Sequence, residues 1–110
     1  MCGIVGMLNL QPGQLADAQI VAQMNQAQYH RGPDEGDQYI DGPVGLGHRR
    51  LSIIDLNQNS SQPMENFEKN LCIVYNGELY NYQSIKIELL AQGYQFKTES
   101  DTEVLLVAYQ

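Results

Sequence analysis

The stretch Met1-Cys2-Gly3-Ile4-Val5-Gly6-Met7-Leu8-Asn9 opens the chain and governs how the rest is interpreted. Its apolar run, residues 3–9, predicts a buried strand that is closed by a turn at Pro12-Gly13. Removal of Met1 would give Cys2 a free α-amine, whose pKa of about 7.7 to 8.0 suits it to take the thiol proton. Since the thiolate is the attacking species, the strand would begin with a self-contained nucleophile. The alternatives are a thiol without a function, or a retained Met1 that leaves no such base.

The composition describes one globular domain of 110 residues, of which 43% are hydrophobic. A net charge of -7 with only six Lys and Arg argues against nucleic acid or an anionic membrane as partner, and favours a small polar substrate. The first thirty residues hold no Lys or Arg and their apolar run, residues 4–10, is short, so we expect no signal peptide. No stretch is long enough to span a bilayer, and we expect a cytoplasmic location. Cys2 and Cys72 would then stay reduced.

Apolar periodicity predicts the remaining elements. We expect helices over residues 15–28 and 82–92 and another that follows Ser100, and strands over residues 38–40, 44–54, 71–75 and 95–98. The first helix would turn a stripe of Ala16, Ile20, Met24 and Ala27 toward the core. In the strand 44–54, alternation puts Val44, Leu46, His48 and Arg50 on one face. Residues 57–66 form a polar loop, and Ser100 with Glu103 has the spacing of a capping box.

Two segments offer groups that could act on a substrate. Asn76-Gly77 follows a predicted strand, where the Asn side chain can donate a hydrogen bond and Gly leaves its N–H accessible. The same dipeptide is also the commonest tight turn, although here a helix follows rather than a partner strand. Arg50 lies among apolar residues and its guanidinium suits a carboxylate, whereas Arg49 is interpreted as a surface residue.

Asp101 leaves two interpretations open. It lies in the first turn after Ser100, where a negative charge complements the helix dipole, and it could equally receive a substrate amine. The sequence contains no motif for metal or nucleotide binding. His30 and His48 lack the spacing of a metal site with either cysteine, and there is no phosphate-binding loop. We therefore expect no metal and no nucleotide on this chain.

Five blocks, taken together, resemble the class II, N-terminal-nucleophile glutamine amidotransferases, and within them the glutamine-hydrolysing asparagine synthetases. The blocks occur in the family's order and run nearly from end to end. They are Met1-Cys2-Gly3-Ile4-Val5-Gly6, His30-Arg31-Gly32-Pro33-Asp34, Gly47-His48-Arg49-Arg50-Leu51-Ser52-Ile53-Ile54-Asp55, Asn76-Gly77-Glu78-Leu79-Tyr80-Asn81 and Ser100-Asp101-Thr102-Glu103.

The resemblance implies that Cys2 hydrolyses the side-chain amide of L-glutamine through a γ-glutamyl thioester. Asn76 and Gly77 would form the oxyanion hole. The remaining site residues would bind substrate: Arg50 its carboxylate, Glu78 and Asp101 its amino and amide nitrogens, and the backbone of Ile53 and Ile54 the wall of the pocket.

The resemblance also implies an α+β fold, an αββα sandwich in which two antiparallel sheets lie between helical layers. Residues 1–110 would be the N-terminal part of the glutaminase domain, without the rest of that domain and without the synthetase (ligase) domain. No cofactor is expected on this chain, and ATP and Mg belong to the absent domain. A homodimeric parent is left open. We expect exposed sheet edges to make the isolated fragment self-associate or be disordered, and we expect it to be weakly active or inactive.

Three alternatives remain open at this point. The chain could be a glutamine-binding module without turnover, an inactive fragment, or the glutaminase half of another class II amidotransferase.

Overall fold

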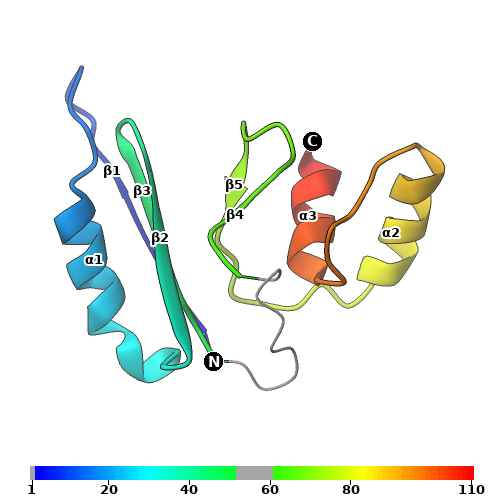
Figure 1. Cartoon of the computed structure of the whole chain (residues 1–110), viewed down its shortest axis with the longest axis horizontal. Helices are drawn as coiled ribbons and strands as arrows, with labels where there is room; N and C mark the ends of the chain where they lie inside the picture. Colours follow the sequence, from blue (N-terminus) through cyan, green and yellow to red (C-terminus); the bar gives the residue numbers. More distant parts are fainter. Residues whose placement is uncertain (1, 52–60) are drawn as a thin grey trace.

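A computed structural model describes residues 2–51 and 61–110 and shows a layered molecule (Figure 1). A helix, a three-stranded sheet, a two-stranded sheet and a pair of helices follow one another across it. In chain order the elements are β1 (Gly3–Leu8), α1 (Ala18–Ala27), η1 (Tyr29–Arg31), β2 (Glu35–Asp41), β3 (Val44–Arg50), β4 (Met64–Glu65), β5 (Cys72–Ile73), α2 (Tyr82–Ala91) and α3 (Asp101–Tyr109). The mixed helices and antiparallel sheets confirm the predicted α+β class, and the layer order is compatible with an αββα sandwich.

Strand β3 is the centre of the three-stranded sheet, with β1 on one side and β2 on the other, both antiparallel to it. The register pairs Gly3 with Arg49 across β1 and β3, and Glu35 with Arg50 across β2 and β3. Strand β2 is longer than the predicted 38–40. The predicted strand 44–54 is confirmed as far as Arg50, while its residues 52–54 lie outside the described part of the chain.

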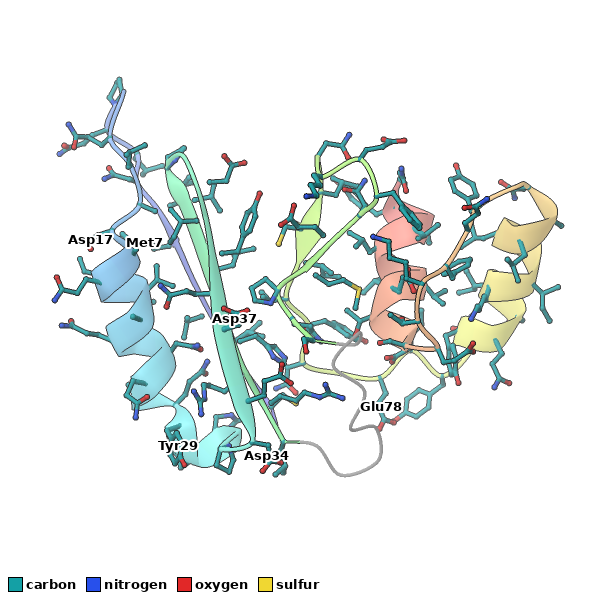
Figure 2. The ribbon with its side chains drawn as sticks, viewed as in Figure 1. Met7, Asp17, Tyr29, Asp34, Asp37 and Glu78 are labelled. Atoms are coloured by element: carbon teal, nitrogen blue, oxygen red, sulfur yellow. The ribbon has the colours of Figure 1, made fainter. Side chains whose placement is uncertain are left out.

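Helix α1 covers one face of this sheet (Figure 1). It begins after Asp17, labelled in Figure 2, whose Oδ1 accepts hydrogen bonds from the backbone N–H groups of Gln19 and Ile20 at 2.9 and 3.4 Å. The predicted stripe is wrong at Ile20 and Ala27, which are exposed, whereas Ala16 is buried and Met24 half-buried. The buried residues of α1 are Val21 and Asn25, whereas Ile20 is exposed.

Two glycines of β3 explain which face of α1 is buried. A Cβ placed at Gly45 would lie 2.6 Å from Val21 Cγ2, and one at Gly47 would lie 3.1 Å from the Asn25 side-chain amide. Val21 and Asn25 therefore occupy the space that two side chains of β3 would otherwise fill. Asn25 Nδ2 also donates to the carbonyls of Asp37 (Figure 2) and His48, at 3.2 and 3.3 Å. The buried amide is satisfied, which allows a polar residue in this layer.

The apolar run of β1 predicted a buried strand, but the structure does not bury both of its faces. Gly3 is buried on the side of α1, whereas Ile4 and Leu8 are 47% and 59% exposed. The reason is that residues of a strand alternate between faces, and the face opposite α1 is only partly covered. The described residues contain no helix long and apolar enough to cross a membrane.

The second half of the chain departs further from the predictions. The predicted loop 57–66 contains β4, which pairs with β5 through Met64 and Ile73, and β5 is shorter than the predicted 71–75. Helix α2 matches its prediction closely.

The predicted strand 95–98 does not form. Instead the buried Glu103 carboxylate of α3 accepts the backbone N–H groups of Lys97 and Thr98, at 2.9 and 2.7 Å. The predicted capping box is therefore wrong in its Glu103 half. Ser100 does cap α3, accepting from the N–H of Thr102 at 3.1 Å.

Gly32 gives a direct test of how closely the segment before β2 packs against the backbone of β3. A Cβ at Gly32 would lie 2.5 Å from the Arg50 backbone nitrogen and closer still to the Arg49 carbonyl carbon. Because backbone atoms cannot rotate away, we expect Gly32→Ala to destabilise the fold by about 1–3 kcal/mol in chemical denaturation. Gly6→Ala is the control, since its Cβ would meet Leu46 Cδ2 at an ordinary 3.5 Å. Equal stability of the two variants would contradict this packing.

Candidate active site

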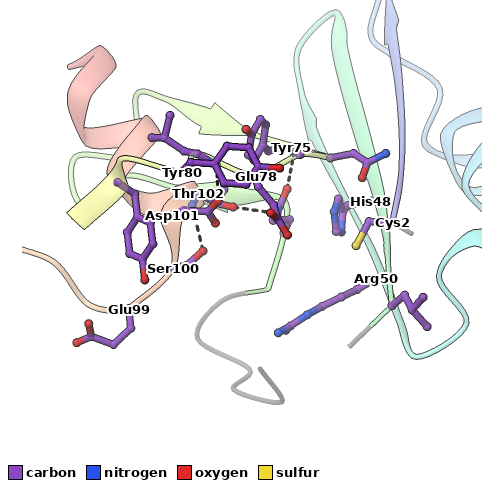
Figure 3. A pocket seen from close by; sticks show the side chains of 16 residues that line it. Cys2, His48, Arg50, Tyr75, Glu78, Tyr80, Glu99, Ser100, Asp101 and Thr102 are labelled. Carbon is purple, nitrogen blue, oxygen red and sulfur yellow. Dashed lines mark hydrogen bonds between the residues drawn. The ribbon is translucent and has the colours of Figure 1, made fainter. Parts of the chain in front are cut away.

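One cavity of about 520 Å³ opens between the end of β3 and the N-terminal end of α3 (Figure 3). Five segments that are distant in sequence line it: the residue before β1, the end of β3, Gln62 before β4, the loop between β5 and α2, and the start of α3. Every predicted site residue that the structure describes is found there, namely Cys2, Arg50, Asn76, Gly77, Glu78 and Asp101. Ile53 and Ile54 lie outside the described residues.

Strand register brings Cys2 to Arg50. Because β1 and β3 are antiparallel and Gly3 pairs with Arg49, the residue before Gly3 comes opposite Arg50. Gly45 and Gly47 face α1, so alternation turns His48 and Arg50 to the opposite face, toward the cavity, as the sequence predicted. Arg31 Nε donates to the backbone carbonyl of Cys2 at 3.1 Å and so holds the start of the chain.

A carboxylate holds Arg50 in place. Arg50 Nη1 lies 3.4 Å from Glu35 Oε2, and the Arg50 side chain is only 12% exposed. The other oxygen of Glu35, Oε1, accepts a hydrogen bond from Ser61 Oγ at 2.5 Å. Sequence reasoning missed both Glu35 and Ser61, because nothing in either residue's neighbourhood marks it as a partner of Arg50.

Asn76-Gly77 is not a hairpin turn. A type I′ turn needs a positive φ at both central residues, and neither of these two described residues has one. The segment instead leads from β5 into α2. It is held by Gln62, whose Oε1 accepts the backbone N–H of Tyr75 at 2.5 Å and whose Nε2 donates to Thr102 Oγ1 at 3.3 Å. Both Asn76 and Gly77 are exposed, so their donors are accessible from the cavity.

Asp101 joins two walls of the cavity. It is the first residue of α3, and its Oδ2 accepts the backbone N–H of Leu79 at 2.9 Å. The bond fixes the loop that carries Glu78, whose side chain lies close to the N-terminal end of α3 (Figure 2). Asp101 and Glu78 place two carboxylates opposite the Arg50 cation, so the cavity carries separate positive and negative sides (Figure 3).

His48 lines the cavity but was not among the predicted site residues. It is 2% exposed, and its Nε2 is buried without a hydrogen-bond partner among the described residues. Burial lowers the pKa of the His48 imidazole below its ordinary value of 6.5, and the Arg50 cation acts in the same direction. A hydrogen bond with the Tyr75 backbone and the Glu35 charge act against this shift. His48 is therefore neutral near pH 7.

The two cysteines occupy different surroundings. Cys2 lines the cavity, whereas Cys72 lies on β5, apart from the residues that line it. Burial raises the pKa of the Cys72 thiol to about 11, with the Glu65 charge adding to the effect. Cys72 is therefore almost entirely protonated near neutral pH, whereas the thiolate is the reactive species. Among the described residues, no group of three or more His, Cys, Asp or Glu side chains could hold a metal ion.

The chain belongs to the glutamine amidotransferase domain family, whose profile matches residues 1–110. Among its curated relatives, glutamine-hydrolyzing asparagine synthetase 1 of Bacillus subtilis is 49% identical over the whole chain, and asparagine synthetase B of Escherichia coli is 36% identical, also over the whole chain. Asparagine synthetase 2 of B. subtilis is 40% identical over the same extent. The chain spans only 15 to 20% of the length of these three relatives.

The lowered pKa of His48 predicts how stability depends on pH. The unfolded chain takes up a proton at His48 near pH 6.5, while the folded state resists it, so the unfolded state binds more protons as the pH falls. We expect the melting temperature to fall between pH 7 and pH 5, and His48→Gln to reduce that fall. The control is His30→Gln, at an exposed position. An equal pH dependence in the parent and His48→Gln would contradict the assignment.

Proposed function

We propose that these residues form the glutaminase site of an asparagine synthetase-like amidotransferase, in which Cys2 hydrolyses the side-chain amide of L-glutamine. The observation that supports this most directly is the meeting of Cys2, Arg50, Asn76, Gly77, Glu78 and Asp101 in one cavity. These residues come from segments up to about a hundred positions apart, and the family match alone does not bring them together.

The charges of the cavity suit a free amino acid. Glutamine carries a carboxylate and an ammonium group on one carbon, and the cavity offers a guanidinium on one side and two carboxylates on the other. Arg50 binds the α-carboxylate, for which a guanidinium fork is well shaped. Glu78 and Asp101 receive the amino and amide nitrogens, and the backbone of Ile53 and Ile54 completes the wall.

The chemistry starts when Met1 is removed. The freed α-amine of Cys2 takes the thiol proton, and Sγ attacks the side-chain carbonyl carbon of glutamine. The Asn76 side chain and the Gly77 N–H donate to the oxyanion that forms. The C–N bond then breaks, and the protonated amine gives its proton to the departing nitrogen, which leaves as ammonia. Water hydrolyses the γ-glutamyl thioester to glutamate and restores the thiol.

The ammonia serves a second active site. The named relatives are asparagine synthetases, and each is several times longer than this chain. We therefore place residues 1–110 in the N-terminal part of a glutaminase domain of a cytoplasmic enzyme. An ATP- and Mg-dependent synthetase domain, outside these residues, consumes the ammonia to make asparagine.

The nucleophile is tested with an electrophilic glutamine analogue added to the full-length protein. We expect Cys2 to be labelled and Cys72 spared at pH 7 to 8, because a pKa of about 11 keeps Cys72 almost entirely protonated. Peptide mass mapping identifies the site. Cys72→Ser is the control and should label like the parent. Modification of Cys72 alone, or of neither thiol, would refute the assignment.

Ammonia release separates the enzyme from a glutamine-binding module without turnover. We expect Cys2→Ala to bind glutamine in a calorimeter but to release no ammonia. Arg50→Met should weaken glutamine binding, since it removes the cation expected to hold the carboxylate. A parent that binds glutamine without releasing ammonia would favour the module. Ammonia that persists in Cys2→Ala would refute both functions.

A further inference from the structure

Two adjacent residues, Ser61 and Gln62, are linked by hydrogen bonds to groups that hold opposite sides of the site cavity. Ser61 Oγ donates to Glu35 Oε1 at 2.5 Å, and Glu35 is the ion-pair partner of Arg50. Gln62 reaches the other way, to the backbone of Tyr75 at 2.5 Å and to Thr102 at 3.3 Å. This pair, which we term the 61–62 bridge, lies outside the five sequence blocks that carry the family resemblance.

The Ser61 side of the bridge acts on the carboxylate-binding end. An arginine side chain carries about 2 kcal/mol of rotamer entropy, so its affinity for a ligand depends on how firmly it is already held. Glu35 pairs with Arg50 across the sheet through Oε2, and the hydrogen bond from Ser61 holds the other oxygen of Glu35, Oε1. Ser61 therefore limits the motion of the Glu35–Arg50 pair.

The Gln62 side acts on the oxyanion end. Tyr75 directly precedes Asn76 and Gly77, and Thr102 directly follows Asp101. A single amide side chain accepts from the Tyr75 N–H and donates to Thr102 Oγ1, so it ties the loop that carries the oxyanion donors to the start of α3. Both hydrogen-bonding groups of the Gln62 side chain are used in this way.

We infer that Ser61 and Gln62 are positioning residues that set the two ends of the glutamine site independently, Ser61 through Glu35 and Arg50, and Gln62 through Tyr75 and Thr102. This inference rests on the proposed glutaminase function. Neither residue needs to touch the reacting atoms. Ser61 acts on an interaction that is equally present in the bound substrate and the transition state, whereas Gln62 acts on donors that matter most when the oxyanion forms.

The two roles predict different kinetic signatures in the full-length protein. Ser61→Ala should raise the KM for glutamine about three- to tenfold, as expected for one lost hydrogen bond, with kcat unchanged. Gln62→Leu should lower kcat about 10- to 100-fold with little change in KM. That loss is smaller than the about 10²- to 10³-fold loss that follows removal of an oxyanion donor itself. Both constants are measured by ammonia release, per active site titrated with the electrophilic glutamine analogue.

Matched controls and a milder variant keep the test decisive. Ser84→Ala and Gln92→Leu change the same residue types at exposed positions of α2 and at its C-cap, and should match the parent. Thr102→Val removes the Gln62 Nε2 bond and should lower kcat in the same direction as Gln62→Leu, by a smaller factor.

The outcomes separate this inference from the function on which it rests. A KM effect for Ser61→Ala together with a kcat effect for Gln62→Leu and Thr102→Val supports the inference. The inference is overturned if the variants have fewer sites that the glutamine analogue can titrate but an unchanged kcat and KM per remaining site. That pattern would mean that Ser61 and Gln62 have a purely structural role. The inference is also overturned if both residues alter the same constant. A parent that releases no ammonia would instead refute the proposed function, and this inference with it.

Discussion

The structure depends on the antiparallel pairing of β3 with both of its neighbours. Pairing with β1 brings Cys2 to Arg50, and pairing with β2 brings Glu35 to the same arginine. Alternation along β3 then divides its residues between two tasks. Gly45 and Gly47 admit α1 on one face, while His48 and Arg50 line the cavity on the other. A shift of one residue in this register would exchange the two faces and remove the site.

The second half of the chain reaches the site through side chains rather than through a shared sheet. The described strands form two separate sheets, and the cavity lies where their ends approach the start of α3. The loop after β5 is therefore held by individual hydrogen bonds, which the Tyr75 N–H donates to Gln62 and the Leu79 N–H donates to Asp101. Asp101 thus begins α3 and also connects two walls of the cavity, because it accepts the Leu79 N–H. Its proposed binding of a substrate nitrogen adds to these contacts.

Burial gives the polar groups around the cavity different properties. Arg50 is nearly buried yet paired with Glu35, so the cost of desolvating its charge is offset within the protein. His48 is buried beside that cation and is neutral as a result. Cys2 lines the cavity, whereas the thiol of Cys72 is kept protonated by its surroundings. The two cysteines are therefore distinguished by environment, although their side chains are chemically identical.

Periodicity in the sequence predicted most helices and strands, because it is a local property, and the family resemblance carried by short motifs predicted the α+β class and the site residues that meet in the cavity. The sequence missed β4, mistook residues 95–98 for a strand and assigned α1 a stripe of which Ile20 and Ala27 are exposed. Each of these depends on a partner distant in sequence: β5 for β4, Glu103 for residues 97–98, and the glycines of β3 for α1. Only the tertiary structure decided which polar groups meet, such as Glu35 with Arg50 and Gln62 with Tyr75. Such contacts follow from packing between elements, which no local pattern encodes.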